Sequence, residues 1–173
     1  PSGKITMSFP YSVGQIPVYY NHKNTGRPRS DQKYTSKYLD IPNEPLYPFG
    51  YGLSYTKFDY SNLSVDKKEM HPDDKLHVSV TVTNNGNYDG TETAQLYIRD
   101  LVGSVTRPVK ELKGYQQIFL KRGESKTLTF TLTVDDLKFY DKNMKWTYEP
   151  GSFKVFVGGN SRDVLEGDFT LVK

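Results

Sequence analysis

Residues 76–99, LHVSVTVTNNGNYDGTETAQLYIR, decide the fold of this chain. Both halves of the stretch alternate apolar and polar side chains, with apolar positions at Leu76, Val78, Val80 and Val82 and then at Ala94, Leu96 and Ile98. A period of two predicts a β-strand that buries one face and exposes the other. Between the halves, residues 84–90 contain the Asn-Gly and Asp-Gly pairs that favour a tight turn. The stretch therefore predicts two antiparallel strands.

The same alternation recurs downstream, at residues 127–134 and 153–157. Turn residues separate these segments, with Arg-Gly at 122–123 and Glu-Pro-Gly at 149–151. About seven strands at this spacing are typical of an antiparallel β-sandwich, so the chain is predicted to be mainly β. The best helical candidate is residues 134–140, which Asp135 could cap. We expect that segment to be a crossover turn between the two sheets.

Proline marks a division of the chain. Seven of the ten prolines lie in the first 48 residues. Proline interrupts helices and removes a backbone donor that a central strand needs. Residues 1–57 are therefore predicted to form an extended, loop-rich N-terminal arm that lies on a larger body, because such a segment cannot satisfy its own backbone. Residues 58–173 are predicted to form the sandwich, with a core large enough to fold without disulfides.

Composition and charge exclude several classes of function. The net charge of +3 is too small to indicate a nucleic-acid partner. Residues 1–57 have seven Lys/Arg and three Asp/Glu, which gives +4, whereas residues 58–173 have sixteen and seventeen, which gives −1. The excess basic residues of the arm are Lys23, Arg27, Arg29, Lys33 and Lys37. They form either a solvated loop or a surface for an acidic partner.

Three further features bear on the compartment and the state of the chain. The chain has no cysteine, which excludes a disulfide scaffold and a cysteine metal site. No apolar run is long enough to predict a membrane span. The chain begins at Pro1 without a methionine or signal peptide, so we expect a processed or excised piece.

The acidic and basic side chains do not form a recognisable catalytic pattern. A glycosidase needs two carboxyl groups on either side of one bond. The carboxylates of this chain fall in predicted turns or on polar strand positions, and we expect solvent around them: Asp73, Asp74, Asp89, Glu92, Asp100, Glu111, Asp135 and Asp136. The histidines, His22, His71 and His77, lack the spacing of a zinc site. The sequence predicts no metal and no cofactor.

Two aromatic groups are candidates for binding. The first group has two interpretations: it is a sugar-stacking platform or, as we prefer, a linker that buried rings fix to the sandwich. Its members are Tyr47, Phe49, Tyr51, Tyr55, Phe58 and Tyr60. The second, Tyr19-Tyr20-Asn21-His22, offers stacking faces and hydrogen-bonding groups beside the basic loop. Ordinary loop packing would also explain it.

Four long stretches resemble glycoside hydrolase family 3. PSGKITMSFPYSVGQIPVYYNHKNTGRP at 1–28 resembles the end of the α/β-sandwich domain of that family, and YLDIPNEPLYPFGYGLSYTKFDYS at 38–61 resembles the segment that follows it. VTVTNNGNYDGTETAQLYIRD at 80–100 and RPVKELKGYQQIFLKRGES at 107–125 resemble the C-terminal domain. The resemblance implies an immunoglobulin/fibronectin III-like antiparallel β-sandwich preceded by the end of the neighbouring domain.

The resemblance also implies a function for the parent chain. Family members are retaining enzymes that hydrolyse terminal β-D-glucosides and sometimes β-xylosides. Neither their nucleophile motif nor their acid/base motif occurs in residues 1–173. We therefore expect an inactive accessory domain, with its own upstream catalytic domains as partner and β-glucoside as their substrate. We expect a periplasmic or secreted bacterial location, and a homodimer is one assembly to test. No nucleic acid, membrane, metal or cofactor is implied.

The resemblance places one loop near the substrate pocket of the complete enzyme, and the candidate rim residues are Tyr19, Tyr20, His22 and Arg27. The alternative function is a carbohydrate- or cell-surface-binding module with exposed aromatic side chains. A third possibility is a purely structural spacer. A fold of this type supports all three roles, so fold alone cannot choose between them.

Overall fold

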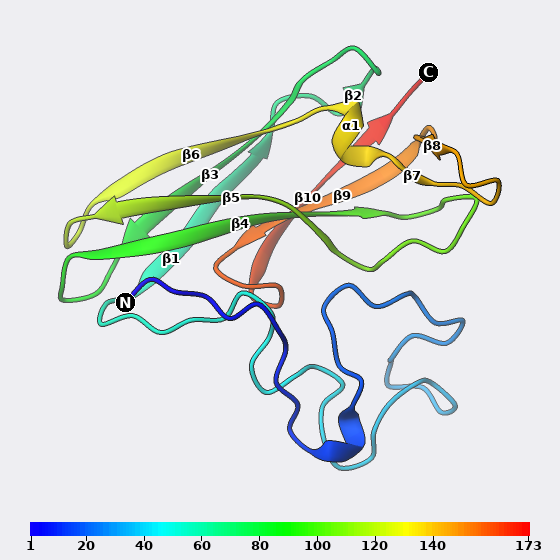
Figure 1. The fold of residues 1–173 in the computed structure, drawn as a ribbon. Helices are drawn as coiled ribbons and strands as arrows, with labels where there is room; N and C mark the ends of the chain where they lie inside the picture. Colours follow the sequence, from blue (N-terminus) through cyan, green and yellow to red (C-terminus); the bar gives the residue numbers. More distant parts are fainter.

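The computed structural model describes residues 1–173, and the chain folds as a β-sandwich with a long arm along one side (Figure 1). Three strands form the smaller sheet in the order β1-β3-β6, where β1 is Phe58–Val65, β3 is Leu76–Asn84 and β6 is Ser125–Leu132. The larger sheet has the order β2-β10-β9-β4-β5, with β2 at Glu69–Met70, β10 at Val164–Leu171, β9 at Gly151–Gly158, β4 at Gly90–Asp100 and β5 at Glu111–Leu120. The mainly-β sandwich predicted from the sequence is confirmed.

The predicted number of strands also agrees with the structure. Seven strands have eight or more residues, and the remaining three, β2, β7 (Phe139–Tyr140) and β8 (Trp146–Thr147), have two each. One pairing is not antiparallel, because the short β2 lies parallel to β10. Met70 in β2 is fully buried, so this strand brings a core side chain to the end of the sandwich.

The core lies between the two sheets and uses the alternating positions of the strands. β3 alternates buried and half-buried residues along most of its length, as its sequence predicts. Eighteen buried residues, seventeen from the two sheets and Leu137 from the crossover between them, form one cluster, in which the rings of Phe153 and Phe169 stack with centroids 5.2 Å apart. Burial of each such side chain stabilises the fold by about 1.5–3 kcal/mol.

The crossover expected at residues 134–140 contains one helical turn, α1 at Val134–Leu137. Its cap differs from the prediction, because Asp135 does not cap the turn. Thr133 precedes the helix, and its backbone N–H and Oγ1 donate to the carboxylate of Asp136 at 2.8 and 3.1 Å. The side chain of Asp135 instead pairs with Lys138 at 2.6 Å.

The arm contains almost no regular structure, as the prolines predict. Its only helical element is a 3-10 turn, Val13–Gln15. Gln15 is 2% exposed and connects two parts of the arm. Its Nε2 donates to the carbonyl oxygens of Pro42, Asn43 and Glu44 at 2.9, 3.2 and 3.0 Å, and its Oε1 accepts from the N–H of Tyr11 at 2.8 Å. This buried amide adds to the backbone bonds that join the same two parts, such as the pair between Phe9 and Tyr47. No helix is long and apolar enough to cross a membrane.

The β7–β8 hairpin provides a pH-dependent prediction. Its turn is fixed by Asp141, whose Oδ1 accepts from the N–H groups of Asn143 and Lys145 at 2.8 and 2.9 Å. The Lys145 N–H bond to the carboxylate holds the pKa of Asp141 below its usual value. The stabilisation that the Asp141 carboxylate gives the hairpin is therefore fully present above the pKa of Asp141 in the unfolded chain, about 4. It is lost as the pH falls through the lower pKa of Asp141 in the folded chain.

Trp146, the only tryptophan, lies on this hairpin and reports on it. We expect its emission to be constant from neutral pH down to about pH 4 and to shift below that value as the turn loosens. Asp141→Ala should show the shifted emission already at neutral pH, whereas Asp135→Ala should keep the original profile. An unchanged profile for Asp141→Ala would show that the carboxylate does not fix the turn.

Candidate functional site

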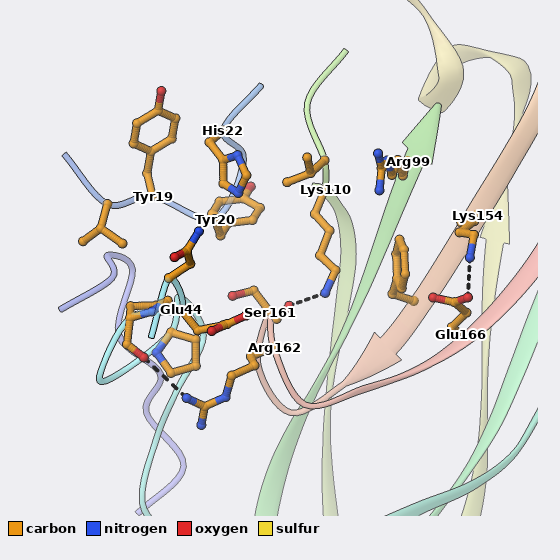
Figure 2. A pocket seen from close by; sticks show the side chains of 16 residues that line it. Tyr19, Tyr20, His22, Glu44, Arg99, Lys110, Lys154, Ser161, Arg162 and Glu166 are labelled. Carbon is orange, nitrogen blue, oxygen red and sulfur yellow. Dashed lines mark hydrogen bonds and ion pairs between the residues drawn. The ribbon is translucent and has the colours of Figure 1, made fainter. Parts of the chain in front are cut away.

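A cleft of about 430 Å³ lies between the arm and the outer face of the larger sheet (Figure 2). The arm contributes aromatic and proline side chains, and the sheet contributes charged ones. Figure 2 shows Tyr19, Tyr20 and His22 on one side, and Arg99, Lys154 and Glu166 on the other. This cleft is the candidate site because most of the predicted rim residues meet there.

A buried junction between arm and sheet builds the cleft. Tyr97 of β4 is fully buried although it points away from the core, and its hydroxyl donates to Oε1 of Gln95 at 2.5 Å. Nε2 of Gln95 in turn donates to the carbonyl oxygens of Gly50 and Gly159 at 3.1 and 2.7 Å. Gly50 has φ of +78°, and a Cβ there would lie 2.0 Å from Oε1 of Gln95. Only glycine therefore allows this approach.

Aromatic packing continues the junction into the arm. The Tyr20 ring stacks on Phe49 with centroids 4.3 Å apart and meets Tyr97 edge-on at 5.7 Å. Two backbone bonds fix the arm beside these rings, from Val109 N–H to the His22 carbonyl at 2.9 Å and from Ser161 N–H to the Phe49 carbonyl at 2.9 Å. The arm is thus attached to the sheet by buried rings and direct hydrogen bonds.

Cations dominate the sheet side of the cleft. Lys110 lies 4.7 Å above the Phe156 ring, and its Nζ donates to the Ser161 carbonyl at 2.5 Å. Burial lowers the pKa of Lys110, and the nearby carboxylates of Glu166 and Asp163 partly oppose this effect. Lys154 pairs with Glu166, and Arg99 and Arg162 line the same side, so the cations outnumber the carboxylate that faces the arm.

The structure brings together three of the four predicted rim residues. Tyr19 and His22 are exposed, and their rings meet edge-on at 6.4 Å. Tyr20 also lines the cleft, but its ring packs on Phe49, and its hydroxyl accepts from the Leu112 N–H at 3.4 Å. Arg27 does not line this cleft and lies instead in a shallow hollow of the 26–35 loop.

The expectation of solvated carboxylates is wrong for Glu92 and Asp100, which are each 6% exposed. Glu92 pairs with Lys4 of the arm at 3.0 Å and accepts from the Tyr60 hydroxyl at 3.0 Å. Burial, followed by the Glu92 charge, strongly raises the pKa of Tyr60. Glu92 lies two residues before Ala94, so it shares the inward phase of the core residues of β4, and the expectation of solvent followed its charge instead of its position.

Asp100 belongs to a second buried group, at the opposite end of β4. Its Oδ2 lies 3.7 Å from Nε of Arg107, whose Nη2 bonds Oε2 of Glu111 at 2.7 Å. The Arg107 guanidinium also lies 4.3 Å above the Phe139 ring. Burial raises the pKa of Asp100, against the backbone bond from Val102 and the charge of Arg107. This group joins the loop after β4 to the β7–β8 hairpin.

The aromatic cluster at residues 47–60 is mainly an anchor, as we preferred. Phe58 and Tyr60 pack against the core, and Phe49 and Tyr51 are half-buried. Tyr47 and Tyr55 are exposed, by 43% and 81%. The rings of Tyr47 and Tyr51 are tilted by 38° at 5.0 Å, so they do not form one flat platform.

Sequence reasoning missed the residues that face the arm, chiefly Gln95, Tyr97 and Phe156 of the sheet and Lys110 of the loop before β5. A signal was present in β9, where Val155, Phe156 and Val157 place apolar side chains on both faces. Such runs are typical of strands that are covered on both sides. Tyr97 gave a weaker signal, because tyrosine is also common on wet strand positions.

Known proteins resemble this chain throughout its length. Residues 92–161 match the family described as "Fibronectin type III-like domain". The chain is 51% identical to the periplasmic beta-glucosidase of Salmonella typhimurium, over 99% of its own length and 23% of that protein. It is 43% identical to the thermostable beta-glucosidase B of Acetivibrio thermocellus, over 95% of its length and 22% of that protein.

Solved structures agree with these similarities. A beta-glucosidase from Listeria innocua in complex with glucose matches with a TM-score of 0.92 and 47% identity, over 100% of this chain and 24% of that one. The chain thus spans about a quarter of the length of the relatives it matches. Together these findings show that residues 92–161 resemble a fibronectin type III-like domain and that the chain is similar over its whole length to the C-terminal part of β-glucosidases.

Proposed function

We propose that this chain is the C-terminal accessory part of a retaining β-glucosidase of glycoside hydrolase family 3 that acts in the periplasm or outside a bacterial cell. Such an enzyme uses two carboxyl groups and a covalent glycosyl-enzyme intermediate. The resemblance assigns both groups to upstream domains, which the sandwich would stabilise. The full-length similarity to β-glucosidases supports this function.

The observation that carries the proposal is the exposure of large apolar side chains along the arm. Val13, Ile16 and Leu39 are 84%, 61% and 100% exposed. Large exposed apolar side chains that gather on one segment mark an interaction surface. We therefore propose that residues 1–57 complete the domain that precedes the sandwich and that the upstream domains cover them. Residues 58–173 would be the accessory domain itself.

The cleft would then lie where the arm meets the catalytic part of the enzyme. In this arrangement Tyr19, Tyr20 and His22 would border the substrate pocket, with Arg27 further out on its loop. This placement is supported by the fact that Tyr19, Tyr20 and His22 line the same cleft. A homodimer is a separate prediction, and sedimentation of the whole protein would test it.

Hydrolysis of an aryl β-glucoside tests the proposed activity. The protein encoded by the whole gene should hydrolyse the substrate, and the 173-residue chain should not. Activity in the isolated chain would contradict the accessory role and would place a carboxylate pair within residues 1–173. An inactive whole protein would contradict the β-glucosidase assignment.

A second prediction tests the covering of the arm. Val13→Asp should leave the unfolding midpoint of the isolated chain almost unchanged, because surface substitutions usually change stability by less than about 0.5 kcal/mol. In the whole protein the same change should lower the midpoint, because it would bury an unpaired charge at a cost of several kcal/mol. Val102→Asp is the matched control, since Val102 is 80% exposed on the sandwich and should have little effect in either protein. Equal midpoints for the two variants of the whole protein would show that Val13 is not covered.

A further inference from the structure

The only tryptophan of the chain is exposed. Trp146 lies in β8 and is 52% exposed, and its strand partner Tyr140 in β7 is 57% exposed. Their ring centroids are 4.8 Å apart and the planes are tilted by 52°, so each ring keeps one face that its partner does not cover. Tryptophan is usually highly buried, so a half-exposed tryptophan beside a second exposed ring requires an explanation.

Stabilisation of the hairpin is the simplest explanation, because aromatic cross-strand pairs contribute to sheet stability. The hairpin has other anchors, however. Phe139 is 2% exposed beneath the Arg107 guanidinium, and Asp141 fixes the turn through two backbone N–H groups. The open faces of Tyr140 and Trp146 contribute to neither anchor, which leaves them available for a ligand.

The surroundings indicate the chemistry of that ligand. Apart from Met144, which is 74% exposed, the turn between the two rings is polar: Asp141, Lys142, Asn143 and Lys145. A protein interface usually has an apolar centre larger than two rings. A pyranose ring instead has apolar C–H faces and hydroxyl groups at its rim, which suits two aromatic faces surrounded by exposed donors.

We propose that Tyr140 and Trp146 form a surface site for a neutral β-linked oligosaccharide, with a pyranose ring stacked on the indole and a second contact to the phenol ring. The choice of a β-linked glucan rests on the proposed function. Strands β7 and β8 lie on the sandwich, away from the arm (Figure 1), and neither Tyr140 nor Trp146 lines the cleft. It would keep a saccharide close to the enzyme without taking part in hydrolysis.

Tryptophan fluorescence of the 173-residue chain tests the site directly, with cellotetraose as the probe. We expect a saturable change in emission with an apparent Kd on the order of 1 mM. The affinity should not change when the ionic strength is raised, because the ligand is uncharged. Tyr140→Ala should weaken binding about tenfold. Tyr115→Ala is the control, because Tyr115 is 70% exposed on β5. This variant should bind the sugar as the original chain does.

Calorimetry with Trp146→Ala removes the dependence on the fluorophore and should detect no binding, while circular dichroism should show an unchanged fold. The proposal is overturned if emission does not respond to cellotetraose, or if Tyr140→Ala binds as the control does. It is also overturned if emission changes with protein concentration and not with the sugar, since the rings would then contact a second copy of the chain. None of these outcomes bears on the aryl β-glucoside assay, which tests the proposed function separately.

Discussion

Tyr97→Ala is expected to lower the free energy of unfolding by about 3–5 kcal/mol, as for other large aromatic residues that are replaced by alanine in a core. Tyr97 is fully buried between β4 and the arm, with Tyr20 5.7 Å from its ring. The substitution opens a cavity there and also removes the hydroxyl that bonds Gln95. Urea unfolding, followed by circular dichroism, measures the loss.

Two variants separate the contributions to this effect. Tyr97→Phe keeps the ring and should lose only about 1 kcal/mol, the usual contribution of one hydrogen bond. Tyr115→Ala removes a tyrosine that lies opposite Gln95 on the neighbouring strand but is 70% exposed, and it should lose less than about 0.5 kcal/mol. If Tyr97→Ala were as mild as Tyr115→Ala, the arm would not pack on the sheet in solution. Limited proteolysis of the original chain would then cut the arm readily, because the sheet would not protect it.

Local periodicity explains why the sandwich could be predicted. In β3 each apolar residue faces the core and each threonine, serine or histidine faces out, so the sequence states which face is buried. The turn at Asn84 to Gly90 and the prolines of the arm are equally local signals. A period of two and a turn residue need no knowledge of distant segments, and these features were predicted correctly.

The candidate site depends on contacts that a local pattern cannot show. Gln95 is polar and alternates correctly, yet it is buried because the arm, 45 residues away at Gly50, covers it. Glu92 pairs with Lys4 across 88 positions of the chain. Only the tertiary fold brings these residues together. The aromatic residues near Tyr20 could be recognised as a group, but not their partner Tyr97.

Arg107→Met is expected to lower the free energy of unfolding by about 3 kcal/mol, because it leaves the buried carboxylate of Asp100 and the half-buried one of Glu111 without their cation. The side chains of Arg107 and Asp100 are 11% and 5% exposed, and Arg107 also bonds Glu111 at 2.7 Å. Methionine has a similar length, so the lost charge should outweigh the lost volume.

Asp100→Asn and a change of pH identify the cause of this loss. In the Arg107→Met background, Asp100→Asn should restore part of the stability, because it removes the buried charge that lacks a partner. Burial already raises the pKa of Asp100, and loss of Arg107 should raise it further. The folded state then binds a proton more tightly than the unfolded chain, so stability falls as the pH rises from the usual aspartate pKa to the raised one. The loss of stability in Arg107→Met should therefore shrink as the pH falls from neutral towards about 4.

Arg122→Met is the control, because it removes an exposed arginine and should cost less than about 0.5 kcal/mol at every pH. Equal losses for the two arginine variants would show that the group around Asp100 does not stabilise the sandwich.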